Sequence, residues 1–222
     1  MSKSIEQSFV SQGFRLAGTL RLPDALGAGA RRPLIIVLHG FGSNRSAANV
    51  QGPCEAFEAL GYATFCFDMP GCGQSEGPRG NLICLEQVQA TRDAFTHVCQ
   101  QAQVRADAVM VAGSSFGGAV AVYAAALEQG LRGAISSGGW GHGERKVRGQ
   151  HPGEEGWARF TAMLAQGRAY RARTGRSMMV PRNEIVPIPG GLKRQLVTGA
   201  LDEFTRSEEH TSELQSRQYL VC

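Results

Sequence analysis

The central residue of the sequence GSSFG, at residues 113–117, is Ser115, which lies between two glycines. The apolar run DAVMVA precedes this segment, and the small-residue run GAVAVYAAAL follows it. A G-x-S-x-G pattern between a strand and a helix is typical of a sharp turn that exposes a nucleophilic serine hydroxyl, and the helix N-terminus favours developing negative charge. Ser115 is therefore the candidate nucleophile. The alternative is a glycine-rich strand–helix turn without chemistry.

A second segment, LHGFG at residues 38–42, ends another apolar run. Acyl transfer needs two backbone N–H groups that point at the developing oxyanion, and one of them comes from the residue after the nucleophile. Phe116 and Phe41 are the candidate donors. His39 lies on this donor loop, so we interpret it as a residue that packs the loop and not as a base.

The elements that would position these residues alternate along the chain up to residue 137. An antiparallel opening pair is expected at IEQSFV and RLAGTLRL. Buried strands are expected at PLIIVLHG, YATFCFD, DAVMVAG and LRGAISSG, with helices at PCEAFEAL, LEQVQATRDAFTHVCQQ and FGGAVAVYAAAL. Pro53 is expected in the first turn of its helix and Gly61 at its end. The pattern predicts an α/β fold with a mostly parallel sheet and helices on both faces.

A third motif, FDMPGCGQSEG at residues 67–77, directly follows the predicted strand YATFCFD. With HGFG before it and GSSFGG after it, the order of motifs resembles the α/β-hydrolase superfamily, and more narrowly its serine aminopeptidase-like and acyl-hydrolase branch. The branch's D-x-x-G-x-G-x-S pattern is matched by Asp68, Gly71, Gly73 and Ser75. The resemblance covers residues 5–137 and implies that Asp68 is structural and not the acid of a catalytic triad.

The same resemblance implies a triad in the chain order Ser, Asp or Glu, His, with the last two after later strands. His142 and His151 follow Ser115 but precede any further predicted core strand. His97 precedes the nucleophile, on a predicted helix, where we expect a surface or groove position. His210 lies in the C-terminal segment. None of these histidines is expected to be the base.

The pattern changes after residue 137. Residues 138–205 contain one long helix candidate, at about 154–173, between segments rich in Pro and Gly, and no buried-strand run. We expect an all-helical cap insertion. Its arginines are interpreted as solvated surface, with binding of an acidic substrate group as the alternative. Four apolar side chains fit either an acyl pocket or ordinary packing: Trp140, Trp157, Phe160 and Met163.

Residues 206–222 have a different origin in our interpretation. Arg206–Ser216 resembles a common short-read sequencing adapter translated in frame, and the last four residues match the sequence that follows the adapter's index. We therefore expect native sequence to end near Thr205, before the last strands of the fold. This predicts that the triad acid and histidine are missing, and that the chain is inactive and is unstable or aggregates.

Composition argues against several other classes of protein. The net charge of +4 is small and scattered, which argues against a nucleic-acid partner. The six cysteines form no C-x-x-C pair and no metal-binding pattern, and no dinucleotide or phosphate loop follows a strand, so neither a metal nor a cofactor is expected. No signal peptide or membrane-spanning run is present, and a cytoplasmic location is expected.

These observations predict a serine hydrolase that cleaves a small-molecule carboxylic ester, thioester or amide through an acyl-enzyme at Ser115. Phe41 and Phe116 would supply the oxyanion donors. Two alternatives remain open. One is a noncatalytic binding protein with the same fold, and the other is an acyltransferase that uses the same serine.

Overall fold

The computed structural model describes residues 3–23, 30–187 and 217–220 of the 222-residue chain. The chain divides into two compact units. The first, here called the core unit, comprises residues 1–78 and 83–141, and the second unit comprises residues 79–82 and 142–222. The predicted boundaries at 137/138 and 205/206 stay predictions, and the second of them lies outside the described residues.

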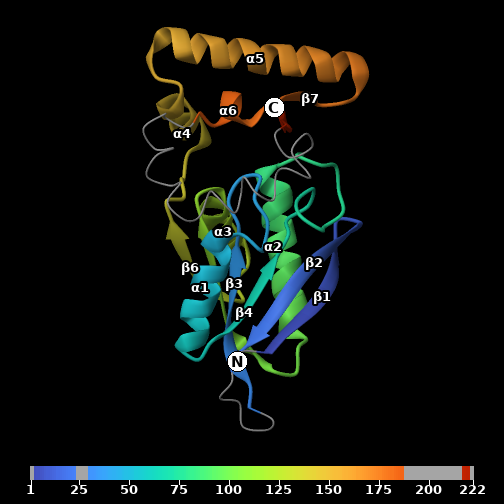
Figure 1. Cartoon of the computed structure of the whole chain (residues 1–222), viewed down its shortest axis with the longest axis vertical. Coiled ribbons are helices and arrows are strands. Elements are labelled where there is room, and N and C mark those ends of the chain that lie inside the picture. Colours follow the sequence, from blue (N-terminus) through green and yellow to red (C-terminus); the bar gives the residue numbers. More distant parts are fainter. Residues whose placement is uncertain (1–2, 24–29, 188–216, 221–222) are drawn as a thin grey trace. The chain divides into compact units, whose positions relative to one another are not determined.

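The core unit is built on a six-stranded sheet with the order β1-β2-β4-β3-β5-β6 (Figure 1). β1 and β2 pair with each other in antiparallel fashion, β2 also runs antiparallel to β4, and the four strands from β3 to β6 are parallel. The strands are β1 (Lys3–Ser11), β2 (Phe14–Leu22), β3 (Arg32–Leu38), β4 (Ala63–Phe67), β5 (Val104–Ser114) and β6 (Leu131–Ser137). The predicted α/β fold with a mostly parallel sheet is confirmed.

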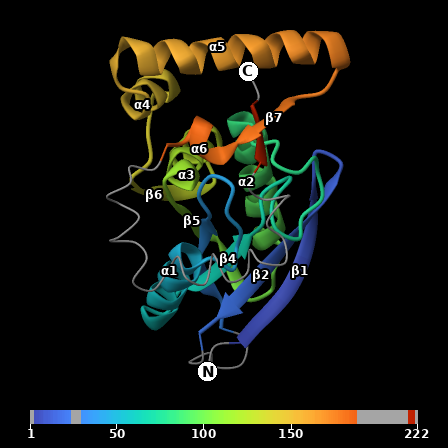
Figure 2. The ribbon, with the colours of Figure 1, turned by 45° about the horizontal axis from the view of Figure 1, so that its top comes forward.

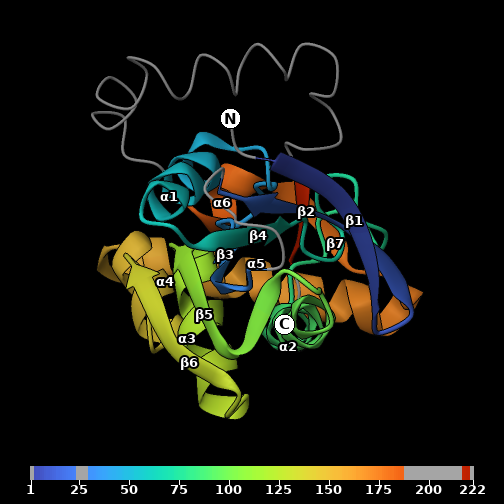
Figure 3. The same ribbon diagram turned by 90° about the horizontal axis from the view of Figure 1, so that it is seen from below.

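Three helices cover this sheet: α1 (Ala48–Ala59), α2 (Cys84–Cys99) and α3 (Phe116–Leu127). Figure 3 shows α1 on one face and α2 with α3 on the other. β3 reads as a continuous apolar run because both of its faces are covered. Its residues 34–38 are at most 2% exposed, and Ile35 and Val37 pack with Val50 and Cys54 of α1. Alternation along the strand turns the neighbouring side chains to the opposite face.

The start of α1 differs from the prediction. The helix begins at Ala48, so Pro53 lies inside it and not in its first turn. No side chain caps this end, because the N-cap residue is Ala47, and the sequence therefore carries no start signal there. Pro53 has no N–H to donate to the helix, and packing of α1 on the sheet has to offset that loss. The predicted end is confirmed, since Gly61 follows the helix with a φ of 88°.

The second unit contains α4 (Gly143–Gln150), α5 (Gly153–Thr174), β7 (Met178–Pro181), α6 (Arg182–Ile185) and β8 (Arg217–Leu220). Figure 2 shows the long helix α5 with β7 following it in the chain. The helix predicted at about 154–173 is confirmed as α5. The expectation of an all-helical segment is wrong, because β7 pairs antiparallel with β8. β7 has only four residues, of which only Val180 is buried, so it shows no apolar run in the sequence.

The four apolar side chains for which an acyl pocket and ordinary packing were the alternatives are divided between the two units. Trp140 belongs to the core unit, where its ring lies 5.9 Å from that of Phe116. In the second unit, Phe160 stacks on His151 with ring centroids 4.3 Å apart, and Trp157 stacks on Phe160. Phe160 and Met163 line a cavity of about 310 Å³ in this unit.

The strand β6 lies at one edge of the six-stranded sheet. In the described part of the chain β6 pairs only with β5, and its Ile135 is 41% exposed. An unpaired strand edge with an apolar side chain is a template for association with another copy. We expect the chain to self-associate in a light-scattering measurement, and we expect Ile135→Lys to reduce the scattering at equal concentration.

A matched control is Leu60→Lys, since Leu60 is 73% exposed and follows a helix. This substitution adds the same charge away from the strand edge and should leave most of the scattering. A monomeric scattering profile for the unmodified chain, or equal rescue by both lysines, would contradict edge association.

Candidate active site

Ser115 occupies a strained turn between β5 and α3. Its φ is 54° and its ψ −118°, a backbone conformation that side-chain-bearing residues rarely adopt. Hydrogen bonds on both sides hold it: its N–H donates to the Ser137 carbonyl at 2.8 Å, and its own carbonyl accepts from Ala119 N–H at 3.2 Å. Such strain persists only where the surrounding structure over-determines the backbone. The serine is exposed at the N-terminus of the helix.

The glycines on either side of Ser115 are required by close backbone contacts. A Cβ on Gly113 would lie 2.3 Å from the carbonyl oxygen of Gly117. A Cβ on Gly117 would lie 2.4 Å from the carbonyl oxygen of His39 and 2.7 Å from that of Leu38. The nucleophile turn (residues 113–117) is therefore pressed against the donor loop (residues 39–42) at a distance that only glycine permits.

The two candidate oxyanion donors meet through their side chains. The rings of Phe41 and Phe116 contact edge to face, with centroids 5.7 Å apart. Phe116 is the first residue of α3, so its N–H has no acceptor within the helix. The donor loop also reaches the nucleophile itself, since a Cβ on Gly40 would lie 3.7 Å from the Cβ of Ser115. The structure thus brings Ser115, Phe41 and Phe116 together.

His39 is buried and uses both ring nitrogens. Its Nε2 accepts a hydrogen bond from Met69 N–H at 3.1 Å, so the ring proton is on Nδ1, which lies 2.8 Å from the Gly40 carbonyl oxygen. Burial lowers the pKa of the imidazole below its ordinary value. Because neither nitrogen is available to take a proton from a substrate or from Ser115, His39 joins the donor loop to the end of β4 instead of acting as a base.

Asp68 is also structural. It is 2% exposed, and its carboxylate accepts hydrogen bonds from the backbone N–H groups of Arg45 at 2.7 Å and Gln74 at 2.8 Å. The guanidinium of Arg45 completes a buried ion pair with it. A Cβ on Gly73 would lie 2.3 Å from the carboxyl group, so the glycine makes room for this acid. With its oxygens engaged, Asp68 does not serve a triad.

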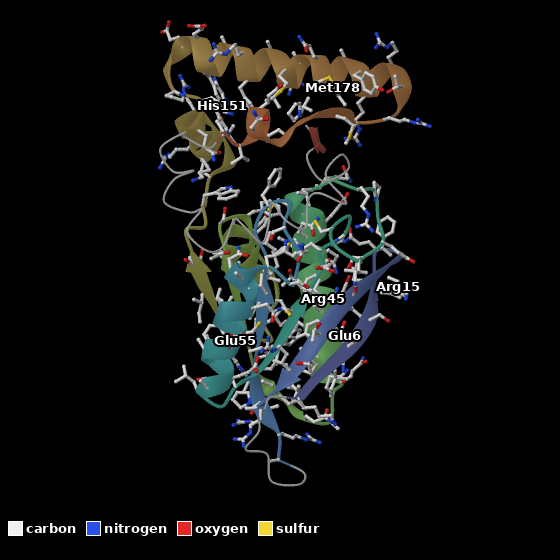
Figure 4. All side chains as sticks on the ribbon, viewed as in Figure 1. Glu6, Arg15, Arg45, Glu55, His151 and Met178 are labelled. Atoms are coloured by element: carbon white, nitrogen blue, oxygen red, sulfur yellow. The ribbon has the colours of Figure 1, made fainter. Side chains whose placement is uncertain are left out.

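The ion pair extends to the antiparallel strands. Arg45, in the turn before α1, also donates to Glu6 of β1 at 2.8 Å and to Thr19 of β2 at 3.2 Å (Figure 4 labels Arg45 and Glu6). Ser75 accepts from Ala17 N–H at 2.9 Å and donates to the Asp68 carbonyl. Sequence reasoning missed Arg45, because its partners come from distant parts of the chain. The only signal was a single basic residue shortly after the HGFG motif.

The other described histidines have partners elsewhere. His142 caps α4 by accepting from Arg145 N–H at 3.2 Å, and His151 lies 3.2 Å from the Ile185 carbonyl oxygen, both in the second unit. His97 is half-buried and its ring stacks on Phe9 with centroids 5.4 Å apart, which is compatible with the expected surface or groove position. Within residues 3–23 and 30–187, no histidine hydrogen-bonds to the Ser115 side chain. His210 lies outside the described residues.

No group of three or more His, Cys, Asp or Glu side chains suited to a metal ion occurs in the described residues. Over the same residues, no helix is long and apolar enough to span a membrane.

The fold is that of an α/β hydrolase, and a solved structure has the same fold. The α/β hydrolase GrgF from Penicillium superposes with a TM-score of 0.67 at 24% identity, over 98% of this chain and 70% of that one. The family model for serine aminopeptidase, S33, matches residues 29–187, and the chain belongs to this family.

Two other proteins are similar to this chain in sequence. An uncharacterised 31.7 kDa protein encoded in the traX-finO intergenic region of Escherichia coli is 31% identical over 173 residues, which are 77% of this chain and 57% of that protein. The thiohydrolase aneE of Aspergillus aculeatus is 31% identical over 125 residues, or 56% of this chain and 37% of that one. The chain therefore spans little more than half the length of the Escherichia coli relative it matches.

The contact between the nucleophile turn and the donor loop predicts a large effect of Gly117→Ala. The added methyl would overlap the His39 carbonyl, which is backbone and cannot turn aside, and overpacking of this kind costs about 1–3 kcal/mol or more. We expect the free energy of unfolding in urea to fall by that amount.

The matched control is Gly52→Ala, because Gly52 lies within α1 and a Cβ there meets nothing within 4 Å. This substitution should stabilise the chain by up to about 1 kcal/mol. Equal effects of the two alanines would show that the close contact at Gly117 does not hold in solution.

Burial of His39 predicts a pH-dependent stability. Its folded-state pKa is lowered, so the unfolded chain binds the proton more readily, and the stabilisation is complete above about pH 6.5 and lost as the pH falls below it. Urea unfolding between pH 5 and 7 should show this slope, which can reach about 1.4 kcal/mol per pH unit for one proton.

His39→Gln should reduce the slope. Burial also lowers the pKa of His97, so His97→Gln should remove a separate part of it. An unchanged slope in the His39→Gln chain would refute the assignment of a neutral, buried imidazole.

Proposed function

We propose that this chain is part of a serine hydrolase that cleaves a carboxylic ester, thioester or amide through an acyl-enzyme on Ser115. The observation that carries the proposal is the left-handed backbone of Ser115 between two glycines that tolerate no Cβ. Strain of this kind is concentrated at functional sites. In a turn without chemistry, glycine would be favoured at this position, because glycine adopts a φ of 54° without strain and serine does not.

The mechanism follows from the positions of three residues. The Ser115 hydroxyl attacks the substrate carbonyl, a C–O bond forms, and the carbonyl oxygen becomes an oxyanion. The N–H groups of Phe41 and Phe116 stabilise this charge. The bond from the carbonyl carbon to the leaving group breaks, and the leaving group takes the proton that the Ser115 hydroxyl gave up. Water then attacks the acyl-enzyme, the C–O bond to Ser115 breaks, one proton of the water returns to the serine, and the acid is released.

In our proposal, no described residue is the base or the acid of the triad. We propose that residues 206–222 are translated adapter sequence and that the native chain continues differently after Thr205. Without a base, loss of activity on the order of 10⁴–10⁶-fold is expected. Sequencing the source DNA beyond codon 205 tests this origin, because a genomic sequence that encodes Arg206–Ser216 would refute it.

The surroundings of Ser115 support an apolar acyl group on the substrate. The rings of Phe41, Phe116 and Trp140 form a continuous aromatic cluster in the core unit, with successive centroids 5.7 and 5.9 Å apart. Phe41 and Trp140 are partly exposed, so an apolar group next to the nucleophile would bury their surface. The name of the thiohydrolase relative supports a thioester among the candidate substrates.

A noncatalytic binding protein is the second candidate. It is favoured by one observation, namely that no described histidine hydrogen-bonds to Ser115. Such a protein would retain the aromatic cluster but would have no reactive serine. The two candidates therefore differ in the chemistry of one hydroxyl group.

A fluorophosphonate probe with imidazole as an added base tests the proposal. We expect slow labelling of Ser115 alone and faster labelling with imidazole, since the added base replaces the missing one. Ser115→Ala should abolish the labelling, and Ser46→Ala, at an exposed serine of the loop before α1, should not. A folded chain that imidazole does not make reactive at Ser115 would favour the binding protein.

A further inference from the structure

Asn49 connects the first turn of α1 to the nucleophile turn. Its Nδ2 donates a hydrogen bond to the Ser114 Oγ at 3.1 Å. Ser114 is the last residue of β5 and immediately precedes the nucleophile. This hydrogen bond is therefore a direct link between the helix that follows the donor loop and the strand that carries Ser115.

The link lies beside the nucleophile. The position of a Cβ on Gly40 would be 3.7 Å from the Cβ of Ser115 and 3.9 Å from the Nδ2 of Asn49. The amide and the nucleophile thus flank the same buried glycine of the donor loop. Asn49 is exposed and Ser114 is half-buried, so this is a polar contact at the surface of the site and not part of the core.

The nucleophile turn is held on two sides, by the donor loop and by the helix α1 that follows this loop. On one side, Gly117 contacts the carbonyls of Leu38 and His39. On the other, Asn49 bonds to Ser114. The oxyanion donor Phe41 belongs to this loop, and the donor Phe116 belongs to the turn, so the spacing of the two N–H groups depends on both contacts. A displacement of about 1 Å in such a site can cost on the order of 100-fold in rate.

We propose that Asn49 is a positioning residue, which holds the Phe41 and Phe116 N–H groups at the spacing an oxyanion requires by bonding to Ser114. The proposal rests on the function proposed for Ser115. It also explains why a neutral amide suits this position, because a carboxylate there would repel the developing oxyanion.

Ser115→Cys gives a readout that needs no catalytic base. A thiolate at this position is stabilised by the same donors and by the N-terminus of α3, so its pKa should fall below the ordinary value of about 8.5. The rate of alkylation by iodoacetamide, measured at this site by peptide mass spectrometry from pH 5 to 10, reports that pKa. The other cysteines are followed as separate peptides in the same digest.

Five single substitutions and one double variant are then compared in the Ser115→Cys background. Asn49→Ala and Ser114→Ala should each lower the alkylation rate at neutral pH about 5-fold, as expected for one hydrogen bond, and the double variant should lose no more than either one. Ser114→Thr keeps the accepting oxygen and should retain the rate. Asn49→Asp should raise the thiol pKa further than Asn49→Ala does. Gln89→Ala, on α2, is the neutral control.

The outcomes distinguish the role proposed for Asn49 from the oxyanion site proposed at Ser115. A thiol that titrates like a free cysteine in the Ser115→Cys chain would overturn the oxyanion site itself. An activated thiol that Asn49→Ala and Ser114→Ala leave unchanged would overturn the role of Asn49 alone. Urea unfolding of each variant is measured alongside the alkylation rates. If Asn49→Ala unfolds the chain, the difference in alkylation rate between Ser114→Ala and Ser114→Thr tests the role of the Asn49–Ser114 hydrogen bond.

Discussion

The contact between the backbone of Gly117 and the carbonyls of Leu38 and His39 sets the geometry on which the candidate site depends. It joins the start of α3 to the end of β3 at a separation that no side chain permits. Because α3 starts at that contact, the chain leaving β5 has to turn sharply, and Ser115 takes up the left-handed conformation at the turn. The strain at Ser115 is therefore a consequence of packing between two neighbouring parallel strands and the helix that follows one of them.

The donor loop is stabilised by a separate network on its other side. Arg45 and Asp68 form a buried ion pair, and removal of one partner from such a pair typically costs about 3–5 kcal/mol. The next residue along from Asp68 is Met69, whose N–H bonds to His39. The network thus runs from the antiparallel strands through the end of β4 to the loop that carries Phe41. The motif containing Asp68 therefore fixes the position of this loop.

Sequence reasoning succeeded where one local pattern determines the structure. β3 and β4 were predictable because strands buried on both faces read as continuous apolar runs. The turn at Ser115 was predictable because its two glycines lie within one five-residue motif. It missed the start of α1, which has no capping side chain, and the strand β7, which is too short to show a pattern. Arg45 and Asn49 were missed for another reason. Their partners are 23 and 65 residues away, and only the folded sheet brings them together.

The positioning of the nucleophile and the supply of a base are separate structural problems in this fold. The contacts given above that shape the turn and the donor loop come from described residues of the core unit, and none of them is a hydrogen bond from a histidine to Ser115. The oxyanion site that we propose would consequently form together with the sheet, whatever segment completes the triad. Since Ser115 is exposed, a base needs only to reach its hydroxyl from outside. A chain that lacks the base should for this reason retain a shaped but slow nucleophile, whose reactivity reflects the oxyanion donors alone.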